Sequence, residues 1–310
     1  MRDSRVEKLA DILVDYSCRV GKGDLVGIIG SYQAEPLMLA IYRRCLDRGA
    51  QVALRPSLPH GEPIFYHHAG EEQLEFVWET ERWLAENLDV RFTIIADNNT
   101  RQLSKVDPRK QAVTSRARKP LFDVLMNRGA SGDLRWNVTL FPTEAHAMDA
   151  EMSLEEYEDF YYGACLVDAD DPVAEWKRVG ERHARMIEWI KDRNEVHIEG
   201  EGTDLVLETG GRIWLPADGK ENFPDGEIFT GPREDRTRGR ITFTYPAIYG
   251  GQAVEGIELV FEEGKVVEAT ARKNEEFLLK TLDTDPGARV LGELGIGTNY
   301  GIPGFSGEIL

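Results

Sequence analysis

The pattern of apolar residues changes once along this chain, near residue 192, and that change limits the folds the chain can adopt. Before it, short apolar runs such as "DLVGIIGS" (24–31) alternate with segments in which apolar residues recur every three or four positions. After it, segments such as "RGRITFTYPAI" (238–248) alternate apolar with polar residues, and glycine-rich turns separate them. The sequence therefore predicts an α/β part followed by a part rich in antiparallel strands.

The first part, residues 1–192, has the order typical of parallel βαβ units, because helices separate its short apolar strands. We expect strands at 24–31, 51–57, 90–97 and 134–143. We expect helices at the N-terminus, at 36–50, 71–88, near 120–129, at 152–165 and at 172–192. Ser153 and Glu156 have the spacing of a capping box, which marks a helix start. The predicted fold is an α/β domain with a mostly parallel, doubly wound sheet, ending in two long helices.

The second part, residues 193–310, is predicted to be a separate α+β domain rich in antiparallel strands. Its apolar and polar residues alternate with a period of two. One helix is expected within it, at about 274–282. The domain boundary is placed near residue 193, where the periodicity changes.

Composition excludes several classes of function. The formal net charge of −18 argues against nucleic acid or an anionic membrane as the main partner, because both bind basic surfaces. The sequence has no run of about 20 apolar residues and no secretory signal, so we expect no membrane span. Cys18, Cys45 and Cys165 are widely spaced within apolar helical patterns, which predicts buried free thiols in a reducing compartment. The predicted location is the cytoplasm.

Several familiar catalytic and binding motifs are absent from the sequence. It contains no phosphate loop, no G-x-G-x-x-G fingerprint, no G-x-S-x-G elbow, no H-E-x-x-H and no C-x-x-C pair. His67 and His68 are adjacent, so their side chains point in different directions and are not expected to join one metal site. His183 lies on the apolar side of a predicted helix, where we expect a buried, hydrogen-bonded histidine.

Two glutamates stand out by their surroundings. Glu227 lies in "GKENFPDGEIFTGP" (219–232), between a glycine and an apolar pair, and Glu293 lies in the similar stretch "ARVLGELGIGTN" (288–299). A carboxylate held in a stiff loop beside apolar packing is often a ligand or a catalytic group. Two such carboxylates from separate loops of one domain are typical of a site for a divalent cation.

The sequence resembles a known family, the thermophilic metalloaminopeptidases, which includes leucyl aminopeptidases and aminopeptidases II, T and S. The resemblance extends over most of the chain. It is strongest in "LFPTEAHAMDAEMSLEEYEDFYYGAC" (140–165), "NFPDGEIFTGP" (222–232) and "VLGELGIGTN" (290–299). These motifs are long and unusual, so the resemblance is specific.

The resemblance implies an α/β domain followed by a domain that carries two adjacent divalent ions, zinc, cobalt or manganese. Glu227 and Glu293 match the glutamates that bind these ions in the family. Glu293 is also expected to lie near the attacking water, as a catalytic residue. The implied reaction removes single N-terminal residues from peptide substrates, with a water activated by the two ions. The implied assembly is a homodimer around a closed central cavity.

The sequence departs from the family pattern at its end. The family's remaining ligands, a histidine, a tyrosine and an H-x-D pair, follow the second glutamate loop and have no counterpart here. The sequence stops at "GIPGFSGEIL" (301–310), on Ile309 and Leu310. We therefore expect the domain at 193–310 to be incomplete at its C-terminus, and this chain alone not to complete the two-metal site.

Two other functions fit the same residues. In a catalytically inactive homologue or scaffold protein, Glu227 and Glu293 would only hold loops together and would point away from any cavity. They would be hydrogen-bonded to backbone groups or paired with arginines such as Arg233 or Arg240. In a single-iron ring-cleaving dioxygenase of related fold, two histidines and one carboxylate would hold the metal. The presence of both glutamates favours the aminopeptidase, because a one-metal site needs fewer carboxylates.

Overall fold

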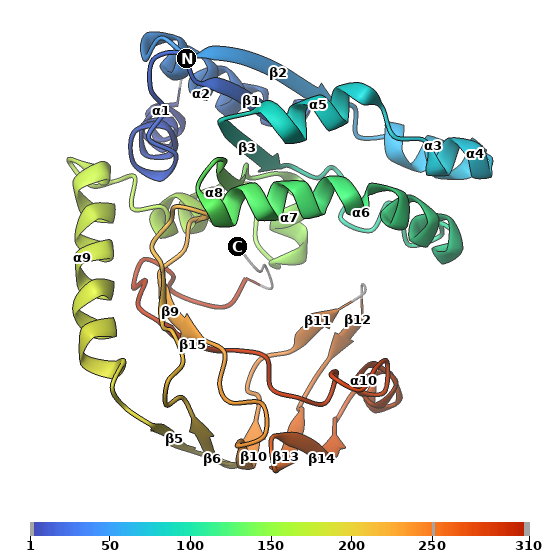
Figure 1. The fold of residues 1–310 in the computed structure, drawn as a ribbon, viewed down its shortest axis with the longest axis vertical. Coiled ribbons are helices and arrows are strands. Elements are labelled where there is room, and N and C mark those ends of the chain that lie inside the picture. The colour runs from blue at the N-terminus through green and yellow to red at the C-terminus, as the bar shows by residue number, and fades with distance from the viewer. Residues whose placement is uncertain (1–2, 250–251, 307–310) are drawn as a thin grey trace.

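Five parallel strands, four from the first part of the chain and β8 from the second, form one sheet with helices packed against it (Figure 1). The computed structural model describes residues 3–249 and 252–306. The strands are β1 Leu25–Ser31, β2 Gln51–Ser57, β3 Val90–Ile95, β4 Arg135–Leu140 and β8 Asn222–Phe223. Their order is β2-β1-β3-β4-β8, and every neighbouring pair is parallel. The predicted α/β architecture with a parallel, doubly wound sheet is confirmed.

The helices of the first part begin with α1 (Ser4–Asp11), which continues as a π-helical segment over Ile12–Ser17. A 3₁₀ turn at Tyr32–Ala34 follows β1. The other helices are α2 Glu35–Asp47, α3 Gly61–His68, α4 Glu71–Glu75, α5 Glu79–Asn87, α6 Pro108–Ser131, α7 Glu144–Asp149, α8 Leu154–Ala164 and α9 Pro172–Ile190. The sequence patterns did not predict α3 and α7.

The helix expected at 71–88 is two helices, α4 and α5. Phe76 and Trp78 take extended backbone angles between them, with ψ of 128° and 136°. Their rings pack edge to face with centroids 5.1 Å apart, which stabilises the break locally. Trp78 and Trp83 are more than half exposed, so they do not lie on the buried side of a helix.

The helix expected near 120–129 also has different bounds, because α6 begins at Pro108. The side chain of Asp107 accepts a hydrogen bond from the N–H of Arg109, and proline is well suited to the first turn of a helix. A second proline, Pro120, lies inside the helix rather than at its start.

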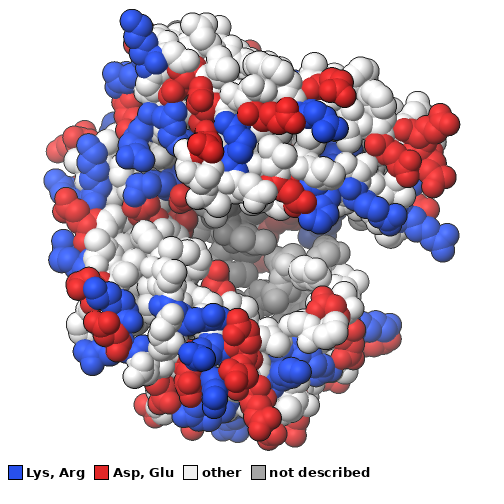
Figure 2. Space-filling model, viewed as in Figure 1, with Lys and Arg blue, Asp and Glu red and all other residues white. Residues whose placement is uncertain are grey.

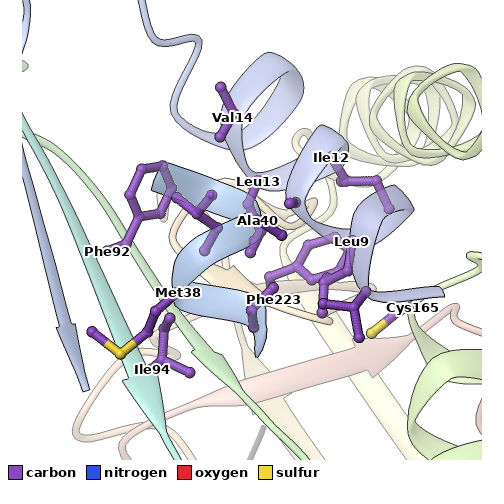
Figure 3. Packing of buried hydrophobic residues seen from close by; sticks show 14 of the residues in the cluster. Leu9, Ile12, Leu13, Val14, Met38, Ala40, Phe92, Ile94, Cys165 and Phe223 are labelled. Carbon is purple, nitrogen blue, oxygen red and sulfur yellow. The ribbon is translucent and has the colours of Figure 1, made fainter. Parts of the chain in front are cut away.

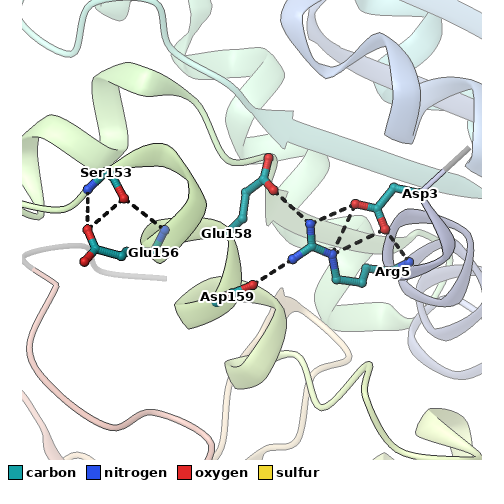
Figure 4. Close-up of polar contacts among 6 residues, drawn as sticks. All are labelled: Asp3, Arg5, Ser153, Glu156, Glu158 and Asp159. Atoms are coloured by element: carbon teal, nitrogen blue, oxygen red, sulfur yellow. Dashed lines mark hydrogen bonds and ion pairs between the residues drawn. The ribbon is translucent and has the colours of Figure 1, made fainter. Parts of the chain in front are cut away.

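The start of α8 is fixed as the sequence predicts. The Ser153 N–H donates to Oε2 of Glu156 at 2.8 Å, and the Glu156 N–H donates back to Oγ of Ser153 at 3.3 Å (Figure 4). Arg5 of α1 pairs with Glu158 at 2.8 Å and Asp159 at 3.0 Å. Such partly exposed ion pairs contribute about 0–1 kcal/mol each, so they orient α1 on α8 more than they stabilise the fold.

The second part of the chain consists mainly of antiparallel strands, as predicted. One sheet has the order β14-β13-β10-β6-β5, a second has the order β15-β9-β7, and β11 pairs with β12. The strands are β5 Glu195–Gly200, β6 Thr203–Glu208, β7 Leu215–Ala217, β9 Glu227–Thr230, β10 Arg238–Thr242, β11 Ala247–Tyr249, β12 Gln252–Val254, β13 Glu258–Glu262, β14 Lys265–Thr270 and β15 Leu294–Gly297. The helix expected at about 274–282 is α10, Glu275–Leu282.

The main hydrophobic core lies between the parallel sheet and the helices that cover it (Figure 3). Leu9 of α1, Phe92 of β3 and Phe223 of β8 are fully buried there. The ring centroid of Phe223 lies 4.8 Å from that of Trp176 in α9. Burying one such side chain contributes about 1.5–3 kcal/mol, so this core holds the chain firmly just before it reaches Glu227.

The division of the chain near residue 193 stays a prediction. β8 follows that point in the sequence, yet it joins the sheet of the first part, where Phe223 is the partner of Thr139 in β4. The segment that leads to Glu227 is therefore attached to the first part of the chain as well as to the second.

The predicted thiols are buried and free. Cys18, Cys45 and Cys165 all lie in the main core and form no disulfide. Burial raises the pKa of Cys45 to about 12 and raises the pKa values of Cys18 and Cys165 further.

The surface carries charges of both signs. Figure 2 shows Lys and Arg side chains interspersed with Asp and Glu over the face in view, and a hollow between its upper and lower parts. None of the helices in residues 3–249 and 252–306 is long and apolar enough to cross a bilayer.

Candidate functional site

Glu227 and Glu293 share one face of the three-stranded sheet. Glu227 opens β9 and Glu293 directly precedes β15, and the antiparallel pairing places Gly297 opposite Glu227. Because side chains alternate between the two faces of a strand, both glutamates point to the same side. Ile228 and Ile296 point to the other side and pack in a hydrophobic cluster. This alternation explains why a glutamate is followed by an apolar residue in the first loop.

The face that carries the glutamates is one wall of a cavity of about 1050 Å³. Small-molecule sites in proteins measure roughly 300–1,000 Å³, so this cavity has room for a short peptide. Its lining also includes residues of α6 and β4 in the first part of the chain: Met126, Gly129, Ala130 and Trp136. The cavity therefore lies between the two parts.

Burial and neighbouring carboxylates raise the pKa values of Glu227 and Asp225 at this cavity. Burial, and then the charge of Glu293, raise the pKa of Glu227. Burial raises the pKa of Asp225 to about 7, although the Gly226 N–H donates to its Oδ1 at 2.9 Å, and Glu227 adds to the rise. The charged forms of Glu227 and Asp225 are thus disfavoured by burial and by nearby negative charge, and a cation bound beside them would favour the charged forms instead.

The donor set at this wall fits part of a divalent metal site. Glu227 and Glu293 line the cavity, and neither forms an ion pair within the described part of the chain. Carboxylate oxygens bind manganese and magnesium well, and zinc accepts them. Residues 3–249 and 252–306 contain no group of three or more His, Cys, Asp or Glu side chains that could hold an ion. The two glutamates are therefore suitable metal ligands, but a complete site needs further ligands beside them.

The expectation that this chain alone does not complete the two-metal site stays a prediction. Ile309 and Leu310, on which it partly rested, lie outside the described residues.

The scaffold alternative predicted arginine partners for the two glutamates. Among residues 3–249 and 252–306, neither Arg233 nor Arg240 pairs with Glu227 or Glu293. Arg233 donates instead from Nη1 to the backbone carbonyl of Gly210 at 3.4 Å. Within the described part of the chain the arginine pairs of the scaffold alternative are not formed, and both glutamates line the cavity rather than pointing away from it.

The histidines behave as the sequence suggests. His67 and His68 lie at the exposed end of α3 and are not part of the cavity lining. His183 is fully buried in α9, and its Nε2 lies 2.7 Å from Oγ1 of Thr298. The prediction of a buried, hydrogen-bonded histidine is confirmed.

Sequence reasoning missed several residues of the cavity. Asp225, Thr298 and Asn299 line it, and all three lie in the stretches that carry the glutamates. For Asp225 and Thr298 the glycine next to each was the available signal, because glycine marks close approaches of the backbone. Met126 and Trp136 have no such signal, since only folding brings α6 and β4 to this site.

Comparison with known proteins identifies the family. The sequence matches the thermophilic metalloprotease (M29) family over residues 2–305. The chain belongs to this family. Aminopeptidase 2 from Geobacillus stearothermophilus is 27% identical over 318 residues, which cover 95% of this chain and 76% of that protein. The structure of wild-type AmpT from Thermus thermophilus has a TM-score of 0.81 at 24% identity, covering 94% of this chain and 78% of that one.

A second solved structure bears on the dioxygenase alternative. The 2,5-dihydroxypyridine dioxygenase from Pseudomonas putida KT2440 has a TM-score of 0.50 at 13% identity, covering 94% of this chain and 76% of that one. At that identity only the fold is shared. The M29 match spans nearly the whole chain, so this M29 protein is a metal-dependent peptidase. Membership of a metalloprotease family implies a bound metal, and the carboxylates of Glu227 and Glu293 are suitable ligands for one.

Proposed function

We propose that this M29 protein is an aminopeptidase that removes single N-terminal residues from peptides, using two divalent ions, zinc, cobalt or manganese. The observation that carries the proposal is the placement of Glu227 and Glu293, from separate loops, on one wall of a cavity large enough for a peptide. The similarity to aminopeptidase 2 supports the class of reaction.

The two glutamates take different roles in this proposal. Glu227 is the more buried of the two and serves as a metal ligand. Glu293 is exposed to the cavity, serves as a ligand, and also moves a proton from the attacking water to the leaving amine. A bound divalent ion supplies Lewis acidity, which acidifies water and polarises a carbonyl group.

The rest of the cavity orients the peptide. The carboxylates of Glu221 and Asp225 line it and attract the positive N-terminus of a peptide while repelling its negative C-terminus. Apolar side chains in the same lining, Met126, Trp136 and Leu215, offer a surface that packs against side chains of many shapes. Together these favour cleavage at the N-terminus with a broad side-chain preference.

We also propose that the protein forms a homodimer in the cytoplasm. Phe76, Trp78 and Trp83 are 53%, 61% and 52% exposed, and exposed aromatic residues are enriched at subunit interfaces. The buried free thiols suit a reducing compartment. Light scattering on a sizing column tests the dimer, because a particle of 35.0 kDa would be a monomer and would contradict it.

The activity is tested with the complete protein, by release of p-nitroaniline from leucyl-p-nitroanilide after chelation and after addition of cobalt, zinc or manganese. We expect release only with metal, and none from N-acetyl-leucyl-p-nitroanilide, which lacks the free amine. Glu227→Gln should abolish release while the melting temperature stays near that of the unaltered protein. Equal release from the acetylated substrate would contradict an aminopeptidase, and an active Glu227→Gln variant would contradict the assigned ligand.

A further inference from the structure

Thr298 connects helix α9 to the backbone just before Glu227. It follows β15, is 5% exposed and lines the cavity. Its backbone N–H and its Oγ1 both donate to the carbonyl oxygen of Gly226, at 2.6 Å and 3.0 Å. That carbonyl belongs to the peptide unit that joins Gly226 to Glu227. Both hydrogen bonds therefore act on the backbone from which the Glu227 side chain departs.

The Thr298 hydroxyl is itself held by His183 of α9. Nε2 of His183 lies 2.7 Å from Oγ1. Because the single hydroxyl hydrogen is donated to Gly226, Oγ1 accepts the hydrogen carried by Nε2. Burial lowers the pKa of His183 and so favours the neutral ring with one N–H. Arg182 adds a bond from its Nη2 to the Thr298 carbonyl at 3.2 Å.

Asn299 holds the preceding peptide unit. Its Nδ2 donates to the Asp225 carbonyl at 2.8 Å and to the carbonyl of Ala164, the last residue of α8, at 3.0 Å. Gly226 has a φ of 131°, a conformation that favours glycine. A Cβ atom at Gly226 would lie 3.2 Å from Cα of Asn299. Close packing against Asn299 thus restricts the backbone conformation of the loop before Glu227.

We propose that Thr298, held by His183, is a positioning residue for Glu227 as a metal ligand. The inference rests on the proposed function, because it takes Glu227 to bind the metal. A ligand that is ordered before the ion arrives binds it more tightly, since no free energy is spent on ordering it. Glu227 stands at the first position of β9, where Ala217 of β7 and Gly297 of β15 pair with it. The peptide unit before Glu227 lies outside the strand, and there the bond from Thr298 Oγ1 to Gly226 adds a side-chain restraint to the backbone bonds that Gly226 forms with Thr298 and Ala217.

The test compares two substitutions at Thr298. Thr298→Val removes the hydroxyl and keeps the branched shape, whereas Thr298→Ser keeps the hydroxyl. We expect Thr298→Val to weaken the binding of Co²⁺ to the metal-free protein by roughly 10- to 100-fold, the loss seen when a partner that orients a ligand is removed. Thr298→Ser should bind Co²⁺ as the unaltered protein does. Isothermal titration calorimetry with cobalt chloride alone measures both.

A buried threonine outside the cavity provides the matched control. Thr209 is also fully buried, and its Oγ1 donates to the Arg193 carbonyl at 3.3 Å. Thr209→Val should lower the melting temperature and leave Co²⁺ binding unchanged. An equal loss of Co²⁺ affinity in Thr209→Val and Thr298→Val would show a general loss of stability and would overturn the positioning role.

Glu227→Gln separates this inference from the proposed function. If Glu227→Gln binds Co²⁺ as tightly as the unaltered protein, or if the unaltered protein binds none, the proposed function fails and the inference fails with it. If Glu227→Gln loses affinity and Thr298→Val does not, only the positioning role is overturned. Should Thr298→Val not fold, His183→Gln and His183→Leu replace it, because a glutamine amide can donate to Thr298 and leucine cannot. Equal Co²⁺ affinities of these two variants would overturn the inference.

Discussion

The carboxylate of Glu227 lies directly over Gly295 on the neighbouring strand. A Cβ atom at position 295 would lie 3.2 Å from Cδ of Glu227, and closer still to Oε2. The missing side chain leaves room for the carboxylate to extend along β15 towards Glu293, whose charge raises the pKa of Glu227. The absence of a side chain at Gly295 thus allows the position that the Glu227 carboxylate takes.

Gly295→Ala should displace this carboxylate. We expect metal-dependent hydrolysis to fall by roughly 10- to 100-fold, as when a metal ligand loses its orientation, while the free energy of unfolding changes little because the glutamate can rotate away. Gly292→Ala is the matched control, since a Cβ atom there meets nothing within 4 Å. Kinetics and urea unfolding of both variants decide the matter. Equal loss of activity in the two would mean that any side chain in this loop disturbs the site.

Phe223→Ala should be among the most destabilising substitutions in the chain. Phe223 is fully buried, and its ring packs on Trp176 with centroids 4.8 Å apart. Removing a buried aromatic ring costs about 3–5 kcal/mol of unfolding free energy. Phe122→Ala, at a position 58% exposed, should change it by only about 0.5 kcal/mol. Urea denaturation measures both, and similar midpoints would contradict the position of Phe223 in the core.

The thiols should stay unreactive while the protein is folded. Cys18, Cys45 and Cys165 are buried, and the pKa of Cys45 is raised to about 12. The thiolate is the reactive form, and almost none is present at neutral pH. We expect Ellman's reagent to detect no thiol in the native protein and all 3 after denaturation in guanidinium. Rapid reaction of a thiol in the native protein would contradict its burial.

Much of the fold could be predicted from the sequence because its two periodicities are clear. The start of α8 was predictable, since Ser153 and Glu156 form a capping box whose bonds are local. The break between α4 and α5 was not, because Phe76 and Trp78 are apolar residues that suit a helix pattern and yet lie exposed. At this break the two rings pack against each other instead of on the buried face of a helix.

The site could be predicted only for residues whose immediate sequence neighbours are unusual. Glu227 and Glu293 each directly follow a glycine and precede an apolar residue, so each could be found in its own loop. The bond from His183 to Thr298 joins residues 115 positions apart, so the burial of His183 could be predicted but its partner could not. Contacts of this kind follow from packing α9 against β15, which no local pattern records.

His183 should make the unfolding free energy depend on pH. Burial lowers its pKa in the folded protein below the ordinary value of 6.5, so the unfolded chain binds the extra proton. Its contribution is therefore fully present above pH 6.5 and is lost as the pH falls from there towards the lowered pKa. His183→Gln cannot titrate but can still donate to Thr298, and other titrating groups such as Asp225 are common to both proteins. Urea denaturation at a series of pH values should show a shallower loss for His183→Gln below pH 6.5, whereas parallel curves would mean that His183 binds protons equally in both states.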